Sequence, residues 1–234
     1  MKNFFITGTD TDVGKTFVMC ALIQAFATRG CRAVPMKPVS AGSIVSDERG
    51  IEMNDDVAAL REVSATTAAL CDINPYRFSE MIAPHLAAQR ENVVVEMNVI
   101  REAFERLKAA ADTVLVEGAG GFLVPLSMKQ SMAEIPTALS LDVIVVVGMR
   151  LGVLNHALLT VEAIRARGLN VAGWVANTTV AGKTMLAFDE NHATLERMMG
   201  APLLGTVPFD AHSTTALERA RRAAPHLRMD TLLR

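Results

Sequence analysis

Residues 8–16, Gly-Thr-Asp-Thr-Asp-Val-Gly-Lys-Thr, carry the strongest chemical signal in the chain. Their pattern is close to the phosphate loop G-x-x-x-x-G-K-[ST], but five residues instead of four separate Gly8 from Gly14. In such a loop backbone N–H groups converge on phosphate oxygens, Lys15 would reach the β- and γ-phosphates, and the Thr16 hydroxyl would bind Mg²⁺. The alternative is a turn with a helix-capping threonine. We predict the phosphate loop, because an apolar run precedes it and a helical pattern follows it.

An acidic residue at the end of another apolar run could supply a second metal ligand. Residues 114–116 are Val-Leu-Val, and they lead into Glu117, which is followed by Gly118, Gly120 and Gly121. An acid at the end of a buried strand beside a phosphate loop is a common magnesium anchor, and glycines let a ligand approach the backbone closely. A strand end followed by a flexible loop is the alternative. Together with the phosphate loop, the pattern predicts that Glu117 binds Mg²⁺.

Other polar positions each have two interpretations. Lys37 follows an apolar run and could either neutralise phosphoryl oxygens or lie in solvent. Asp55 and Asp56 could bind the metal or be acids that favour the first turn of a helix. Asn177 ends a further apolar run, where its amide could pair with an adenine edge or cap a turn. The residues alone leave these choices open.

These side chains need a framework that brings them together. Short apolar runs alternate with longer helical patterns, and several runs are apolar at consecutive positions, as in parallel strands buried on both faces. Helices are expected at 15–28, 98–111 and 153–167, the last ending at Gly168. The alternation predicts an α/β fold with a doubly wound, mainly parallel sheet and helices on both faces. Strands are predicted at 3–7, 32–36, 113–117, 143–147, 171–177 and 203–207.

Residues 37–96 interrupt this alternation. They contain Gly42, Gly50, Pro75 and Pro84, and we predict no strand in them. Connections of this length are often functional, and ligands of doubly wound folds bind at the carboxyl ends of strands. Because the segment leaves the carboxyl end of the second predicted strand, we expect it to overhang the ligand site.

Length and composition limit the domain count and the kinds of partner. The chain has 234 residues, half of them hydrophobic, and no linker or repeat, which predicts a single domain over residues 1–234. A net charge of −2 argues against nucleic acid or an anionic membrane as the main partner. The three cysteines and five histidines lack metal-ligand spacing, and the cysteines suggest reduced thiols in the cytoplasm. No apolar run has the length of a membrane span or a signal peptide.

Taken in order, the motifs resemble those of the dethiobiotin synthetases, ATP-dependent carboxylases of biotin synthesis. The resemblance covers nearly the whole chain and includes GTDTDVGKT, KPV, NPY with APH, VLVEGAGG, LGVLNHALLT and GWVAN. It implies a seven-stranded phosphate-loop fold that works as a homodimer. It also implies conversion of 7,8-diaminononanoate, CO₂ and ATP to dethiobiotin, ADP and phosphate with Mg²⁺, through a carbamate and a carbamic-phosphoric anhydride.

The resemblance gives roles to residues at matching positions. It implies that Lys15 and Lys37 clamp carbamate and phosphoryl oxygens, and that Thr11 lies at the substrate side of the loop. The implied metal ligands are Thr16, Asp56 and Glu117. The other residues implied in nucleotide binding are Asp12, Val13, Gly14, Phe17, Gly118, Ala119, Gly120, Asn177, Thr178, Pro208, Phe209 and Asp210. The residues implied in substrate binding are Ser40, Ala41 and Gly118, with Gly152, Val153 and Asn155 reaching the substrate carboxylate held by a partner subunit.

One position departs from the family pattern. The family usually has K-P-V, any residue, then Ser or Thr, then Gly, whereas this chain has Ser40-Ala41-Gly42. The hydroxyl therefore lies one position early. Backbone groups of the loop, or Ser40 after a local shift, would then take over the substrate contact.

Three other functions compete with this interpretation. ATP-driven partitioning or maturation switches share the superfamily, but they commonly carry an extra lysine early in the loop, where this chain has Asp10. Cobyrinate-type amidating enzymes carry a glutaminase domain, for which 234 residues leave no room. A nucleotide-binding scaffold without catalysis is the third.

Overall fold

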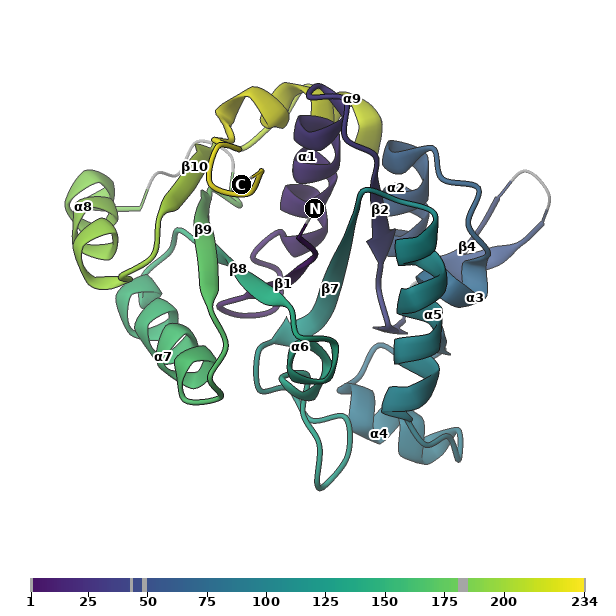
Figure 1. Ribbon diagram of the computed structural model, residues 1–234. Helices are drawn as coiled ribbons and strands as arrows, with labels where there is room; N and C mark the ends of the chain where they lie inside the picture. The colour runs from purple at the N-terminus through teal and green to yellow at the C-terminus, as the bar shows by residue number, and fades with distance from the viewer. Residues whose placement is uncertain (1, 43, 48–49, 181–184, 234) are drawn as a thin grey trace.

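A six-stranded parallel sheet forms the centre of the computed structural model (Figure 1), which describes residues 2–42, 44–47, 50–180 and 185–233. The strand order is β10-β9-β8-β1-β7-β2, so the first strand lies in the middle between β8 and β7. All six predicted strands are present, whereas the resemblance implied seven in the family fold. The strands are β1 (Phe4–Gly8), β2 (Ala33–Met36), β7 (Thr113–Gly121), β8 (Asp142–Gly148), β9 (Val171–Asn177) and β10 (Leu203–Val207).

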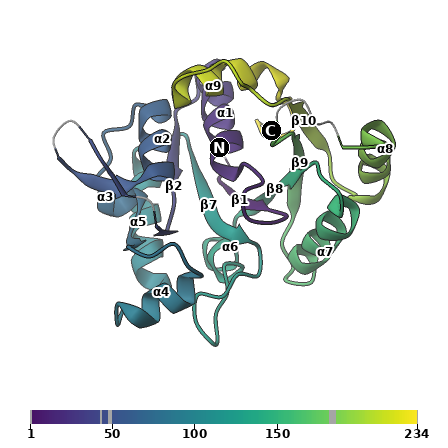
Figure 2. The ribbon, with the colours of Figure 1, turned by 180° about the vertical axis from the view of Figure 1, so that it is seen from behind.

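Helices cover both faces of this sheet, as the two opposite views show (Figures 1 and 2), so the predicted doubly wound α/β fold is confirmed. The first helix is apolar nearly all round because two further helices pack on its outer side. One face carries α1 (Lys15–Ala27), α2 (Asp55–Ser64), α9 (Ala216–Ala223) and the short η1 (Ala224–His226). The other carries α5 (Met97–Ala109), α6 (Glu134–Leu139), α7 (Val153–Arg165) and α8 (Phe188–Met198). No helix in the described part of the chain is long and apolar enough to cross a membrane.

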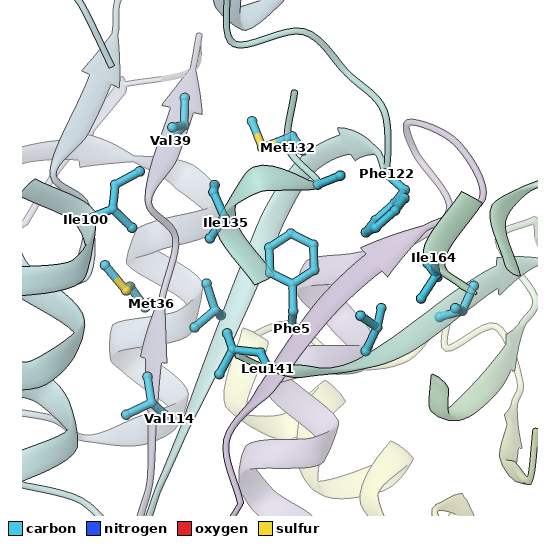
Figure 3. Close-up of a cluster of buried hydrophobic side chains, with 14 of the residues drawn as sticks. Phe5, Met36, Val39, Ile100, Val114, Phe122, Met132, Ile135, Leu141 and Ile164 are labelled. Carbon is cyan, nitrogen blue, oxygen red and sulfur yellow. The ribbon is translucent and has the colours of Figure 1, made fainter. Parts of the chain in front are cut away.

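Two apolar layers hold the helices to the sheet. Figure 3 shows the layer under α5, α6 and α7, with Phe5 of β1 near its centre and Ile100, Ile135 and Ile164 contributed by those three helices. Strand residues alternate between the two layers, as Phe5 and its neighbour Phe4 do. This explains why the strands are apolar at consecutive positions. The sheet is therefore rigid where its strands end and the polar loops begin.

The prediction that residues 37–96 contain no strand is wrong. Within this segment β3 (Val39–Ala41) pairs in parallel with β6 (Tyr76–Phe78), and β4 (Ile44–Ser46) forms an antiparallel pair with β5 (Glu52–Asn54). Each strand has three residues, too few for a periodic pattern to be visible in the sequence. Besides α2, the segment contains two short helices, α3 (Leu70–Ile73) and α4 (Pro84–Arg90).

A buried asparagine ties this segment to the end of β2. The Asn74 amide nitrogen donates to the carbonyls of Lys37 (2.6 Å) and Tyr76 (3.1 Å), and its oxygen accepts from the Ser40 hydroxyl (2.9 Å). These bonds satisfy backbone groups that a regular sheet would otherwise pair. Lys37 and the residues after it are thereby fixed at the carboxyl edge of the main sheet.

Candidate active site

The loop between β1 and α1 contains two residues in the left-handed backbone conformation. Asp12 and Gly14 have left-handed backbones, with φ of 57° and 84°. The Val13 side chain points inward and is buried between two glycines, where a Cβ on Gly8 or Gly148 would lie only 2.6 or 2.7 Å from it. The buried valine anchors the loop, so its backbone can face outward as a phosphate cradle.

The side chain of Asn177, at the end of β9, forms a hydrogen bond to this loop. Its amide nitrogen donates to the carbonyl of Val13 at 2.8 Å, and a Cβ on Gly14 would lie 2.2 Å from that nitrogen. The Asn177 side chain is buried, and its oxygen has no hydrogen-bond partner among the described residues. The sequence left a choice between an adenine contact and a turn cap, and the structure shows a third role, a bond to the phosphate loop.

A cluster of charged groups lies beside the loop. The Glu117 carboxylate accepts hydrogen bonds from the Thr16 hydroxyl (2.7 Å) and the Lys37 ammonium (2.9 Å), and Lys37 also pairs with Asp56. Lys37 and Glu117 are 5% and 1% exposed, so Lys37 is a buried member of the site and the surface-lysine alternative is wrong. Asn54 caps α2 by accepting from the backbone N–H of Asp56 (3.1 Å), which places that carboxylate towards Lys37.

Burial and neighbouring charges shift the pKa values of three members of this cluster. Burial alone would lower the pKa of Lys37, but the carboxylates of Glu117 and Asp56 raise it above its ordinary value. Burial would raise the pKa of Asp56, but Lys37 beside it holds that pKa below its ordinary value. Burial lowers the pKa of Lys15, whose ammonium donates to the backbone carbonyl of Asp10 at 3.1 Å. Lys37 and Asp56 therefore form a charged pair at neutral pH.

The residues implied as magnesium ligands fit that ion. The second oxygen of Glu117 is buried and has no partner among the described residues, so a carboxylate lone pair is free in the cluster. Asp56 and the Thr16 hydroxyl lie around the same group. No cluster of three or more histidine, cysteine or acidic side chains that could hold a metal occurs within the described ranges. Magnesium does not need one, because it binds one or two carboxylates together with waters and phosphate oxygens.

A cavity of about 780 Å³ opens beside the loop and the charged cluster. Residues from the 37–96 segment line part of it, as predicted, and they include Asn54, Met81 and Pro84. Most of the predicted site residues line it together. They are Thr11, Asp12, Gly14, Lys15, Thr16, Phe17, Lys37, Ser40, Ala41, Asp56, Glu117, Ala119 and Gly120.

The predicted adenine residues lie in a neighbouring space. Pro208, Phe209 and Asp210, which follow β10, line a smaller cavity of about 160 Å³ together with Phe17. Thr178 follows β9, and its backbone N–H donates to the carbonyl of Val207 at 3.0 Å. The two cavities lie at the carboxyl ends of the main strands, where a doubly wound fold binds its ligands.

Other predicted residues point elsewhere. Gly118 faces the core, because a Cβ there would lie 2.8 Å from the Phe5 ring, which gives this glycine a packing reason. Gly152, Val153 and Asn155 form the start of α7 and are not among the residues that line the main cavity. The neighbouring Leu151 is 95% exposed. The role predicted for this segment concerns a partner subunit.

The serine that departs from the family pattern is not directed at the cavity through its hydroxyl. Ser40 is 1% exposed, and its Oγ donates to the Asn74 side chain. Ala41 is half-buried and lines the cavity. To donate to a substrate, the Ser40 hydroxyl would therefore have to break this buried hydrogen bond.

Sequence reasoning missed several residues of the cavity wall. Asn54 was recognisable from its place directly before two aspartates and a helical pattern, which is typical of an N-cap. Arg219 of α9 lines the cavity beside Phe17. No local signal places Arg219 at the cavity, because α9 is about 200 residues from the loop in sequence.

Asp10 occupies the position of the extra lysine of the partitioning switches, and its side chain pairs with Arg150.

Known proteins are similar to this chain over most of its length. Residues 2–216 match the family described as AAA domain. The ATP-dependent dethiobiotin synthetase of Aromatoleum aromaticum is 48% identical over 224 residues, covering 96% of this chain and 98% of its own length. The corresponding enzyme of Escherichia coli is 44% identical over 213 residues, covering 91% and 92%.

Solved structures with the same fold are far more distant in sequence. The septum site-determining protein MinD of Pyrococcus horikoshii, complexed with Mg-ADP, has a TM-score of 0.57 at 16% identity and covers 96% of this chain and 93% of its own. A ParA family ATPase of Chlorobium tepidum has a TM-score of 0.55 at 12% identity, covering 96% and 95%. These likenesses support the phosphate-loop α/β fold.

Proposed function

The chain belongs to the dethiobiotin synthetase family, and from this membership we propose how its main cavity makes dethiobiotin with ATP. It is an ATP-dependent enzyme of biotin synthesis. The observation that carries the site assignment is the buried Glu117 carboxylate, bonded to Thr16 of the phosphate loop and to Lys37. This arrangement joins phosphate binding, a metal ligand and a fixed cation in one place.

The phosphate loop and the start of α1 would bind the phosphates of ATP. Backbone N–H groups of residues 12–16 supply donors, and the helix N-terminus adds its dipole. Lys15 would exchange its bond to the Asp10 carbonyl for the β- and γ-phosphate oxygens. Thr16, Asp56 and Glu117 would hold Mg²⁺, which neutralises phosphate charge when bound.

The proposed reaction starts from a carbamate formed by CO₂ and one amine of 7,8-diaminononanoate. A carbamate oxygen attacks the γ-phosphorus, the bond to the β–γ bridging oxygen breaks, and ADP leaves. The second amine then attacks the carbonyl carbon of the anhydride, loses a proton and expels phosphate as the ureido ring closes. Lys15 and Lys37 would stabilise the oxygens on which charge increases, and Thr11, which lines the cavity, would lie at the substrate side of the loop.

The alkyl chain of the diamine fits the apolar part of the cavity. Met81, Ile82 and Val124 line it together with Ala41. Burial of methylene groups against such side chains stabilises binding without charge. The reacting amine end would thereby be directed to the phosphates.

The nucleoside would lie over Phe17, with adenine towards Asn177, Thr178 and residues 208–210. The free acceptor of Asn177 is complementary to the amino group of adenine, although that oxygen is covered in the structure and the base could reach it only after a local shift. We propose that this contact gives the preference for ATP.

The protein would act as a homodimer. Leu151 exposes a large apolar side chain at the start of α7, where solvent contact is unfavourable. Gly152, Val153 and Asn155 would reach the carboxylate of the diamine bound to the partner. We also place the protein in the cytoplasm, in keeping with the free thiols of Cys20, Cys31 and Cys71.

One assay tests the reaction. The pure protein is incubated with diaminononanoate, bicarbonate, ATP and Mg²⁺, and dethiobiotin and ADP are measured together. We expect one ADP per dethiobiotin and almost no ADP when the diamine is omitted. ADP release that does not depend on the diamine, without dethiobiotin, would support an ATP-driven switch instead.

A complementation experiment tests the shared site. In the proposed dimer each site takes Lys37 from one subunit and Asn155 from the other. Lys37→Met and Asn155→Ala each remove one of these groups, so each homodimer should lose activity. Mixed dimers regain one intact site when the two variants exchange subunits, and sedimentation shows whether dimers exist. Absence of recovery in proven mixed dimers, or a fully active monomer, would contradict the proposal.

A further inference from the structure

Phe17 lies at the junction of the two cavities. Among the described residues it is the one side chain that lines both the main cavity and the smaller cavity around residues 208–210. A nucleotide with its phosphates on the loop and its base in the smaller cavity must therefore cross the Phe17 ring. The part that crosses would be the α-phosphate and ribose, because the proposed function places the γ-phosphate beside the bonded cluster of Thr16, Lys37 and Glu117.

A guanidinium group lies over this ring. The central carbon of the Arg219 guanidinium is 6.0 Å from the centroid of the Phe17 ring, within the range of a cation–π contact, and Arg219 also lines the main cavity. The ring is half-buried against the apolar layer under α9, so it offers a fixed support. Arg219 is thus a cation held at the crossing point, on an element far from the loop in sequence.

Hydrogen bonds anchor the start of α9, the helix that carries this arginine. The Thr215 hydroxyl accepts from the backbone N–H of Glu218 at 3.1 Å, and the Glu218 carboxylate accepts from the backbone N–H (3.0 Å) and hydroxyl (2.9 Å) of Thr214. The backbone N–H of Leu217 donates to Glu62 of α2 at 3.2 Å. Reciprocal capping of this kind defines where a helix begins.

We propose that Arg219, supported by the Phe17 ring, binds the α-phosphate of the nucleotide. This proposal rests on the proposed function, because it assumes that the cavity takes ATP. A guanidinium forms strong charge-assisted bonds to phosphate oxygens. The charge on the α-phosphate does not change while the γ-phosphoryl group is transferred. Arg219 therefore stabilises the bound state and the transition state equally, which affects nucleotide affinity and leaves turnover at saturation unchanged.

Direct binding of ADP and AMP tests this assignment. The dissociation constants are measured by calorimetry for the unmodified protein, Arg219→Ala, Arg219→Lys and the control Arg221→Ala. Arg221 is on the same helix but lines a different cavity with Gln24 and Thr28, so its removal gives the same charge change away from the nucleotide. We expect Arg219→Ala to weaken ADP and AMP by the same factor, about tenfold, the scale of one charge-assisted bond. Arg219→Lys should weaken them less, because it keeps the charge and loses the planar contact.

Two further measurements separate the α-phosphate from its neighbours. Phe17→Leu should weaken ADP binding by about threefold to fivefold, because the arginine loses its aromatic support but keeps an apolar neighbour. At saturating ATP the turnover of Arg219→Ala should stay within about twofold of the unmodified protein.

Each contrary result has its own meaning. A loss for ADP but not for AMP would assign Arg219 to the β-phosphate and overturn the proposal. So would equal losses in Arg219→Ala and Arg221→Ala, or a fall in turnover with unchanged affinity. If the unmodified protein binds ADP but makes no dethiobiotin, the proposed function fails while the arginine contact still stands on the binding data.

Discussion

The two ends of the site hold their charges in different ways. At the phosphoryl end Lys37 and Glu117 are almost fully buried and already paired, and they come from two neighbouring main strands. At the nucleoside end Arg219 and Phe209 are exposed. A buried charge is tolerated only when its partners are fixed by the fold. The proposed phosphoryl end is therefore preorganised, whereas the proposed nucleoside end would contribute through contacts that form with the ligand.

This difference gives a general expectation for substitutions. Preorganised charges stabilise the transition state more than the ground state, so their removal should lower turnover. Exposed groups should change affinity. The chain also contains a matched reference, because Lys108 and Glu105 form an ion pair 3.3 Å apart on the surface of α5, with both side chains about half exposed.

The largest effect is expected for Lys37→Met. In the proposed reaction the carbamate must approach a γ-phosphate that carries several negative charges, and Lys37 would place a fixed ammonium beside the group that transfers. We expect turnover to fall by ~100- to 1000-fold, the range seen when one preorganised donor is removed, with ATP affinity nearly unchanged. Turnover and the dissociation constant of ATP are measured on the same variant, with Lys108→Met as control. Weaker ATP binding with normal turnover at saturation would make Lys37 a ground-state phosphate ligand.

Glu117→Gln should have the next largest effect. The amide keeps the shape of the side chain but removes the negative charge that faces Lys37 and the proposed metal. We expect turnover to fall by ~100-fold or more. Binding of Mn²⁺, followed by electron paramagnetic resonance, should weaken as well, which reports on the metal independently of activity. Glu105→Gln is the control. Unchanged activity in saturating Mg²⁺ would remove Glu117 from the metal site.

The framework of the site could be predicted from sequence because burial leaves a local mark. The main strands are short apolar-rich runs, several of them apolar at consecutive positions, and the phosphate loop lies between a strand and a helix as its motif requires. The 37–96 segment gave no such mark. Its strands β3 and β6 each have three residues and pair across more than thirty positions, and a buried asparagine completes their bonding.

The roles of single polar residues could not be predicted from the local sequence, because their partners lie far away along the chain. Lys37 was equally compatible with solvent, because its partners Asp56 and Glu117 are 19 and 80 positions away. Only the fold brings the three together. Asn177 had two plausible roles in the sequence, and its contact with Val13, 164 positions away, was neither of them.

Asn177→Ala should have an intermediate effect that spans both ends of the site. The substitution leaves the buried carbonyl of Val13 without its donor, which should lower the free energy of unfolding by about 1–3 kcal/mol. A less fixed loop should also bind ATP about tenfold more weakly. Thermal unfolding and calorimetry measure the two effects. A loss of affinity for ATP but not for GTP would show a contact to adenine, whereas equal losses would show that the amide acts through the loop.

The smallest effect is expected for Ala41→Ser, which restores the hydroxyl position usual in the family. We expect that Ser40 does not take its place, since its hydroxyl is buried and donates to Asn74 at 2.9 Å. If backbone groups of the loop already hold the diamine, a new hydroxyl at the cavity wall has little left to bind. The apparent affinity for diaminononanoate should then change by less than ~10-fold, below the scale of one well-formed charged hydrogen bond.

The double variant Ser40→Ala/Ala41→Ser separates the two positions, because loss of the Ser40 bond should lower thermal stability without changing diamine affinity further. A large gain in affinity for Ala41→Ser would show that this enzyme lacks a contact that its relatives make. A loss of affinity confined to the double variant would show that Ser40 does reach the substrate.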